Sequence, residues 1–438
     1  MSGERIETQS ALPPTMLRTA LLLLPFQALF RGGEALLPVF LAAWFGRNAE
    51  TDLYNLLAAC FGFTGALVMG AFQDSVVIPI LIETERKDRE LFRQVVGSIL
   101  GHTLVIAALL ALATAGIAVA LGYASSPSHA LLFGLTGAMT VQVLGGSVRA
   151  FFVGLFNARG RFRVHPVASG IGIGFTFAIL VVWRGQLGVR VIPLAMCAGD
   201  LVAIAIMATL AATSLGLGRI APKLSRPEPV RRILSLVRFE TAGQVITRAN
   251  PLVDQLMAGL SGIVGGGTIL KYANDIGSLP TSIIQATFLP IFLTRLSQQA
   301  KAVDEFRTTL RRSLLAVVGV LLVLSLALAA FRLPICRLVF LHGEMDAAGV
   351  AAIADVLAYG LVGVAPFGAL LILARAHVAQ QNTRIMPSMG LLNSVLNASL
   401  NLVLVRTLGL RGIALSTSVT SLVVAVVFWL RLPKVLRG

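Results

Sequence analysis

The chain has few charged residues and very few acidic ones. Only 13% of its 438 residues are charged, and 36 Lys and Arg outnumber 20 Asp and Glu. A globular domain carries about 25% charged residues. Because these charges are too few to cover the surface of a soluble protein of this length, the composition argues against a soluble enzyme.

Cysteines and catalytic motifs are also scarce. Cys60, Cys197 and Cys336 lie far apart, without the Cys or Cys/His spacing of a disulfide framework or a zinc site. The sequence has no Walker loop, no paired catalytic carboxylates and no Ser/His/Asp grouping. We therefore expect no catalytic residue, no metal site and no cofactor. Because no ATPase motif is present, a transport function, if the chain has one, would depend on an H⁺ or Na⁺ gradient, the membrane potential or the substrate gradient.

Long apolar runs are abundant instead. Hydrophobic residues make up 56% of the chain, and the mean hydropathy is +0.85. Since a spanning helix needs about 20 mostly apolar residues, the runs predict about twelve transmembrane helices in an all-α polytopic membrane protein. Six fall at 20–44, 53–81, 95–121, 130–156, 167–183 and 191–215, and six at 241–264, 268–293, 313–331, 350–371, 386–405 and 413–430.

The basic residues indicate how these helices are oriented. With the N-terminus inside, about 25 of the 36 Lys and Arg fall on the inner side and about 7 on the outer side, as the positive-inside rule requires. This asymmetry predicts a multi-pass membrane protein with both termini in the cytoplasm. It also explains the net charge of +16 without a nucleic-acid partner.

A basic connector divides the chain into two similar halves. QALFRGGEALLPVFLAAWFG and QVITRANPLVDQLMAGLSG both open with Gln-x-x-x-Arg, continue with an acidic residue and a proline, and end in glycine. Parallel six-helix repeats related by a pseudo-two-fold axis are a transporter architecture with the substrate site between the halves. The predicted organisation is a cytoplasmic tail at 1–19, an N-lobe at 20–215, the connector at 216–238 and a C-lobe at 239–438.

Charged residues inside or at the ends of the predicted spans are the candidate substrate-binding residues. A charge within the bilayer usually faces a cavity or a partner, and the planar fork of Arg suits phosphate. Arg31 and Glu34 are three residues apart and Lys271 and Asp275 are four apart, so each pair can meet on one helix face. Arg31 and Arg248 occupy matching places in the two repeats. The alternative is that these residues form ion pairs that only fix helix packing. The set is Arg31, Glu34, Asp52, Asp74, Arg248, Asp254, Lys271 and Asp275.

Three further polar residues receive a structural interpretation. Arg149 lies near the inner end of its predicted span, so we expect its long side chain to reach the membrane surface. His102 and Asp200 are expected to be packing or interface residues. The small residues GIGIG at 170–174 lie inside a span with no preceding strand, which favours close helix packing over nucleotide binding.

Several stretches, taken in order, resemble the MurJ/MviN family of lipid II flippases in the MOP exporter superfamily. They are WFGRNAETDLYNLL, GAFQDSVVIPIL, LFNARGRFRVHP, VDQLMAGLSGIVGGGTILKYANDIGSLP, LVFLHGEMDAAGV and RAHVAQQNTRIMPSMGLLNSVLNASLNL. The resemblance implies a MATE-like fold of two six-helix lobes around a cationic cavity. It also implies alternating access and a polyprenyl-diphosphate-linked saccharide as substrate. Arg31 and Asp52 match an arginine and an aspartate that are important in the family.

The chain departs from the family pattern at several charged positions. Leu37 and Thr64 or Gly65 stand where the family has arginines, and Asp275 and Ser278 stand where it has an arginine and a glutamate. The substrate expected from the resemblance is therefore lipid II or another lipid-linked cell-wall or exopolysaccharide unit. Membrane lipids and glycan-assembly enzymes are the expected partners. A MATE-like ion-coupled exporter of small molecules and a non-transporting scaffold are the alternatives.

Overall fold

The structure is a computed structural model that describes residues 14–70, 73–124, 126–237, 249–299, 302–382 and 384–437. Within these ranges it is helical, without strands. The first half contains α1 Pro14–Phe45, α2 Ala49–Gly65, α3 Ile78–Lys87, α4 Arg89–Gly122, α5 His129–Ala158, α6 Val164–Leu187 and α7 Val191–Ser214. The second contains α9 Asn250–Leu260, α10 Gly266–Gly277, α11 Leu279–Gln298, α12 Val303–Ala330, α13 Arg332–Phe340, α14 Ala347–Leu361, α15 Val364–Ala379, α16 Ile385–Leu408, α17 Leu410–Arg431 and α18 Lys434–Arg437.

The helices confirm the predicted fold class. Each predicted span falls on a helix or on successive helices, the seventh being described only from residue 249. In the described part of the chain, seven helices are long and apolar enough to cross a membrane, or eight if the pair α14 and α15, bent by 43°, is one span. This is the architecture of a polytopic membrane protein.

Three of the predicted spans are interrupted rather than continuous. The second consists of α2, the π-helical segments Ala66–Gly70 and Gln73–Val77, and α3. The eighth is divided into α10 and α11, and the tenth into α14 and α15. Pro79 and Pro280 stand in the first turns of α3 and α11, where a proline has no helical hydrogen bond to lose. Apolar runs predict membrane crossings, but they do not show where a helix is broken.

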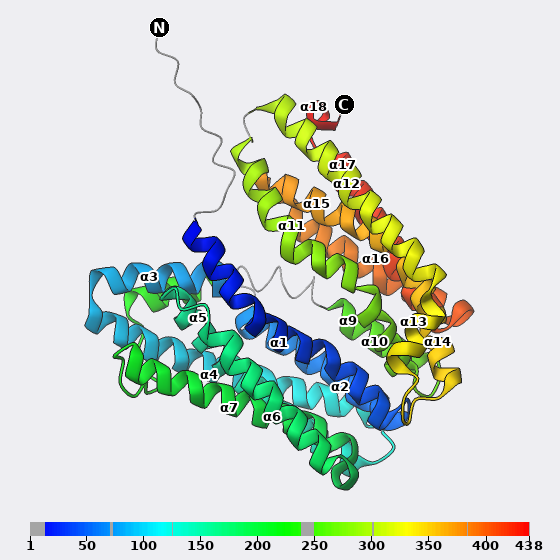
Figure 1. The fold of residues 1–438 in the computed structure, drawn as a ribbon, viewed down its shortest axis with the longest axis horizontal. Coiled ribbons are helices and arrows are strands. Elements are labelled where there is room, and N and C mark those ends of the chain that lie inside the picture. Colours follow the sequence, from blue (N-terminus) through cyan, green and yellow to red (C-terminus); the bar gives the residue numbers. More distant parts are fainter. Residues whose placement is uncertain are drawn as a thin grey trace.

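The two groups of helices form a V (Figure 1). The helices α1–α7 are here called the N half, and α9–α18 the C half. Two buried apolar clusters lie in the N half and one in the C half, which Ala42 of α1 joins. The halves meet at one end, here called the closed end, where residues 46–48, 261–265 and 341–346 lie, and their helices diverge towards the opposite end (Figure 1).

Small residues set the packing of α6 against α7. A Cβ atom added to Gly172 would lie 2.5 Å from the carbonyl oxygen of Gly199, so neither position tolerates a side chain without displacement. Close packing is therefore the role of Gly172 and Gly199, which confirms the prediction for Gly172, whereas a Cβ atom on Gly174 would meet nothing within 4 Å. The crossing places Asp200, the residue after Gly199, against α5.

Candidate functional site

Three adjoining cavities lie along the inner helices of the N half. Their volumes are about 280, 450 and 130 Å³, and we call them the first, second and third cavity. The first and second share Arg149 and Asp200, whereas the first and third share Glu34. The third also contains Lys271 from the C half. The second and third share Tyr54 and Ala58, so each cavity adjoins the other two, and the third extends the group to the place where the two halves meet.

Arg31 and Glu34 pair as their spacing predicts. The Nη1 atom of Arg31 lies 3.0 Å from Oε2 of Glu34 on the same face of α1. Glu34 lines the first and third cavities. Arg31 is not among the lining residues of the three cavities, and 72% of its side chain is exposed. Of this predicted pair, the structure places only the carboxylate at the cavities.

Lys271 and Asp275 also form the ion pair that their spacing predicts. Nζ of Lys271 lies 2.6 Å from both carboxylate oxygens of Asp275, one turn further along α10. Lys271 faces the third cavity together with Glu34 of α1. The structure thus brings predicted site residues of the two halves to one cavity.

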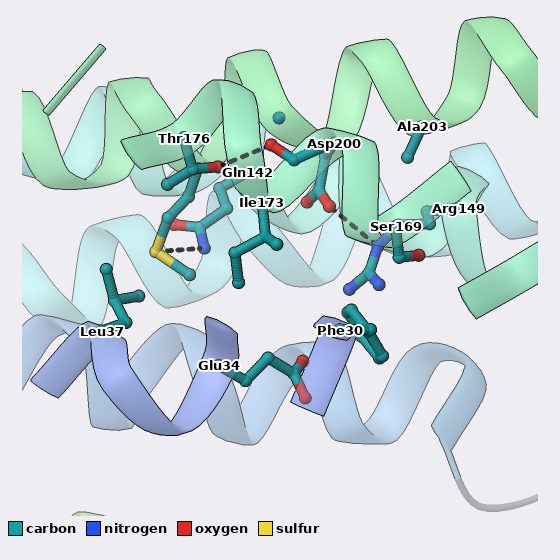
Figure 2. Close-up of a pocket in the computed structure, with 13 residues that line it drawn as sticks. Phe30, Glu34, Leu37, Gln142, Arg149, Ser169, Ile173, Thr176, Asp200 and Ala203 are labelled. Carbon is teal, nitrogen blue, oxygen red and sulfur yellow. Dashed lines mark hydrogen bonds and ion pairs between the residues drawn. The ribbon is translucent and has the colours of Figure 1, made fainter. Parts of the chain in front are cut away.

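The prediction for Arg149 was wrong. Arg149 does not reach towards the membrane surface, because its Nε lies 2.8 Å from Oδ1 of Asp200 (Figure 2). The terminal nitrogens of Arg149 point from α5 into the space in front of α1, towards Phe30 and Glu34 (Figure 2). Both members of the pair line the first and second cavities. The sequence did contain one sign of this pair, because Arg149 and Asp200 are both charged residues within predicted apolar spans.

Two departures from the family pattern lie in the same walls. Leu37 lines the first and third cavities, and Gly65 lines the second. The family resemblance implies an arginine at Leu37 and another at Thr64 or Gly65. In this chain Arg149, from a different helix, supplies a guanidinium to the first and second cavities.

Asp52 joins the two halves at the closed end. Its carboxylate, in the first turn of α2, accepts hydrogen bonds from the backbone N–H groups of Gly265 at 2.6 Å and Thr268 at 2.9 Å, and from the Thr268 hydroxyl at 3.0 Å. These donors belong to the start of α10, where unpaired N–H groups favour an anion. A residue of the N half therefore caps a helix of the C half.

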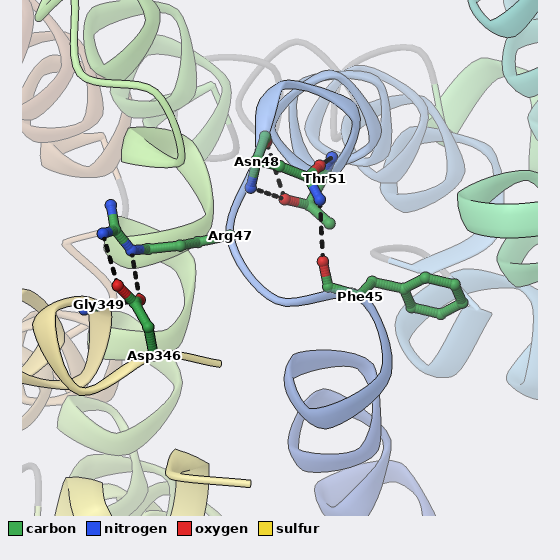
Figure 3. A network of polar contacts seen from close by, with 6 residues as sticks. All are labelled: Phe45, Arg47, Asn48, Thr51, Asp346 and Gly349. Carbon is green, nitrogen blue, oxygen red and sulfur yellow. Dashed lines mark hydrogen bonds and ion pairs between the residues drawn. The ribbon is translucent and has the colours of Figure 1, made fainter. Parts of the chain in front are cut away.

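A second contact joins the halves at the same end (Figure 3). The Nε and Nη2 atoms of Arg47 donate to the two carboxylate oxygens of Asp346 at 2.9 and 3.1 Å. This pairing raises the pKa of Arg47 and lowers the pKa of Asp346. Nearby, the backbone N–H of Glu344 donates to the carbonyl oxygen of Ala43 at 2.9 Å. Sequence reasoning missed this contact because its partners lie 299 residues apart in loops.

Asp254 belongs to a separate polar cluster inside the C half. It is 7% exposed and accepts a hydrogen bond of 2.8 Å from Nδ2 of Asn401. That amide also donates to Asn397, and the Asn397 amide donates to the Thr417 hydroxyl at 3.0 Å. Asp254 and Thr417 line a further cavity of about 370 Å³. The cluster offers carboxylate, amide and hydroxyl oxygens, the ligands that hard cations take, but the described residues contain no group of three or more His, Cys, Asp or Glu that could hold a metal ion.

Two predicted site residues are not placed. Arg248 lies outside the described residues, and so does the side chain of Asp74, although its backbone belongs to the π-helical segment Gln73–Val77. The expectation that Arg31 and Arg248 share one cavity therefore stays a prediction.

The comparisons with known proteins agree on one family. The family model "Lipid II flippase MurJ" matches residues 41–438. The probable lipid II flippase MurJ of Rhizobium meliloti (strain 1021) is 25% identical over 398 residues, which cover 86% of this chain and 72% of that protein. The probable lipid II flippase MurJ of Rickettsia prowazekii (strain Madrid E) is 25% identical over 194 residues, which cover 44% of this chain and 38% of that protein.

Solved structures show the same fold. The lipid II flippase MurJ in an inward closed conformation matches with a TM-score of 0.76 and 16% identity, covering 94% of this chain and 87% of that chain. An inward-facing MATE family transporter of the MOP superfamily matches with a TM-score of 0.69 and 14% identity, covering 92% and 93%. An outward-facing MATE transporter matches with a TM-score of 0.56 and 16% identity, covering 94% and 93%.

Proposed function

Because the chain belongs to the MurJ family of lipid II flippases, we propose that it moves a polyprenyl-diphosphate-linked saccharide across the bacterial cytoplasmic membrane. It acts as a transporter rather than an enzyme, and it serves peptidoglycan or a related cell-surface polysaccharide. The observation that carries this proposal is the family match over residues 41–438. The charged cavities between and beside the inner helices supply a place for a polar head group.

The arrangement of the halves supports alternating access. Asp52 and Arg47 of the N half hold Thr268 and Asp346 of the C half at the closed end, while the helices diverge at the other end. The likeness to an inward-facing MATE transporter also exceeds that to an outward-facing one. We take the end rich in Lys and Arg to be cytoplasmic, so this state opens to the cytoplasm and both termini lie there.

The charges suggest how the diphosphate is exchanged for internal counter-charges. Glu34 neutralises Arg31 in the present state at 3.0 Å. A phosphate that binds Arg31 would displace Glu34, which gives two charge arrangements that favour different conformations. Asp254 and Arg248 would play the corresponding part in the C half. The changes at Leu37, Gly65 and Ser278 leave either lipid II or another lipid-linked glycan as the cargo.

Coupling to an ion is the second element of the proposal. Asp254 is a buried carboxylate whose described partners are amides and hydroxyls rather than a cation. A buried negative charge is unfavourable unless a cation neutralises it, so H⁺ or Na⁺ would stabilise Asp254 in the state in which Arg248 contacts the phosphate instead. An ion gradient or the membrane potential could in this way drive the conformational cycle. Glycan-assembly enzymes remain proposed partners.

A flipping assay in proteoliposomes tests the function. The vesicles carry a fluorescent undecaprenyl-diphosphate glycan, either lipid II or an exopolysaccharide unit, and a membrane-impermeant quencher reports the exposed fraction. We expect protein-dependent exchange of at least one of the two lipids between leaflets. A protein that flips neither lipid but exports organic cations under a Na⁺ or H⁺ gradient would be a MATE-like exporter instead.

The orientation is tested by reporter fusions. A fusion after Gly438 should report the cytoplasm, and one in the loop before His129 should report the outside. If both fusions report the same side, the proposed topology is wrong.

A further inference from the structure

Only one nitrogen of the Arg149 guanidinium takes part in the ion pair with Asp200. Its Nε faces Asp200 at 2.8 Å, and 28% of its side chain is exposed. The two terminal nitrogens, which form the rest of the planar fork, have no hydrogen-bond partner among the described residues and point into the space in front of α1 (Figure 2). The ion pair with Asp200 orients the guanidinium, although Nε itself makes no hydrogen bond. The two terminal N–H donors of the fork therefore remain available for another acceptor.

A second donor, which has only a weak acceptor, accompanies Arg149. Gln142 lies two helical turns before Arg149 on α5, and both residues line the first and second cavities. The Gln142 amide donates to the sulfur of Met196 at 3.4 Å, and a thioether is a weak acceptor. One face of α5 therefore presents a guanidinium fork and an amide to the same space.

The carboxylates of these cavities already have partners. Asp200 contacts Nε of Arg149, and Glu34 contacts Arg31. The second cavity, at about 450 Å³, falls within the range of small-molecule sites, about 300–1,000 Å³. An oxyanion with several oxygens fits two parallel guanidinium donors, because such pairs form bidentate charge-assisted hydrogen bonds.

We propose that Arg149 binds a phosphate group of the substrate diphosphate in the N half, with Gln142 as a second donor and Asp200 as the positioning residue. This inference rests on the proposed function for the identity of the substrate. It assigns the contact with the phosphate to α5 and to an arginine that is not among the predicted substrate-binding residues. The planar fork, and not the positive charge alone, carries the binding.

Binding can be measured without transport. The full chain is purified in nanodiscs and titrated calorimetrically with farnesyl diphosphate, inorganic diphosphate and farnesol. We expect Arg149→Gln to weaken farnesyl diphosphate binding at least about tenfold, since hydrogen bonds to charged groups are among the strongest in proteins. Arg149→Lys should bind with intermediate affinity, and farnesol binding should not change. Binding of inorganic diphosphate by the wild type would show that the prenyl chain is not required for the contact with Arg149.

A variant of Asp200 tests whether its carboxylate positions the Arg149 guanidinium or only contributes to packing. Asp200→Asn keeps an oxygen near Nε and removes a negative charge from the cavity. If Asp200 positions the fork, this variant binds farnesyl diphosphate at least as tightly as the wild type. If the pair serves only packing, Asp200→Asn and Arg149→Gln should lower thermal stability alike and should not differ in affinity.

Arg159 and Glu85 provide a matched control. Their Nε–Oε2 distance is 2.6 Å and their side chains are 19% and 30% exposed, similar to the Arg149 pair, but neither residue lines the three cavities. The double variant Arg159→Gln/Glu85→Gln should bind farnesyl diphosphate like the wild type. A double variant Arg149→Gln/Asp200→Asn, which leaves no unpaired charge, should keep its thermal stability but lose affinity.

Two results would overturn the inference. One is equal binding of farnesyl diphosphate by Arg149→Gln and the wild type, and the other is no binding by the wild type. The proposed function fails separately: if the diphosphate binds through Arg149 but the wild type flips no lipid-linked glycan, the binding site stands and the flippase assignment does not.

Discussion

The hydrogen bonds of Asp52 should control how often the closed end opens. Replacing Asp52 with alanine removes the acceptor of two backbone N–H groups and one hydroxyl at the start of α10. Loss of a helix cap costs about 0.5–2 kcal/mol. The upper value applies here, because the carboxylate also joins the two halves. We therefore expect the closed end to be less stable by about 2 kcal/mol, which is about a thirtyfold shift towards its open form.

The shift can be measured as a distance between the halves. Nitroxide labels at Glu50 and Ala348, both exposed and on opposite halves near the closed end, report separation by pulsed electron paramagnetic resonance. The three native cysteines, Cys60, Cys197 and Cys336, are first replaced with alanine. Asp52→Ala should add a longer-distance population, and Asp52→Asn should have a smaller effect because its amide oxygen still accepts one N–H.

Asp88 is the matched control for this prediction. Its carboxylate caps α4 within the N half, accepting from Glu90 and Leu91 at 2.8 and 3.2 Å. Asp88→Ala should lower thermal stability without changing the distance between the labels. If Asp52→Ala gives the wild-type distance distribution, or if Asp88→Ala separates the labels as much, the carboxylate does not hold the halves together.

Three further predictions concern the closed end and Arg31. Gly343→Ala should separate the halves in the same distance measurement, because its φ is +59° and a Cβ atom would lie 2.1 Å from the Ala43 carbonyl oxygen; an unchanged distance would contradict this. The pKa of Asp346 is lowered by Arg47, so their pair supports the closed end at neutral pH and is lost as pH falls through that lowered pKa, below the ordinary range of an aspartate. The effect should stay under about 1 kcal/mol at this exposed site, and Asp346→Asn should abolish this pH dependence of the label distance. Arg31→Lys should keep part of the flipping activity and Arg31→Ala none at equal membrane expression, whereas wild-type flipping by Arg31→Ala would make the arginine structural.

Properties that depend on nearby residues could be predicted from the sequence. The apolar runs predicted the membrane crossings, because burial of some 20 residues in lipid is a property of one continuous segment. The pairs Arg31–Glu34 and Lys271–Asp275 were predicted because helix geometry alone brings residues three or four apart together. The ordered motifs predicted the family, which the match over residues 41–438 confirms.

Contacts between distant residues were decided only by the tertiary structure. Asp52 reaches Gly265 and Arg47 reaches Asp346 across 213 and 299 residues, and no local periodicity relates such positions. The prediction for Arg149 failed for the same reason. The sequence shows how far Arg149 lies along its helix, but the direction of its side chain depends on Asp200. The close crossing of α6 and α7 brings Asp200 against α5. Charge in an apolar span marks a residue for attention, whereas packing determines whether that charge faces lipid, a partner or the cavity.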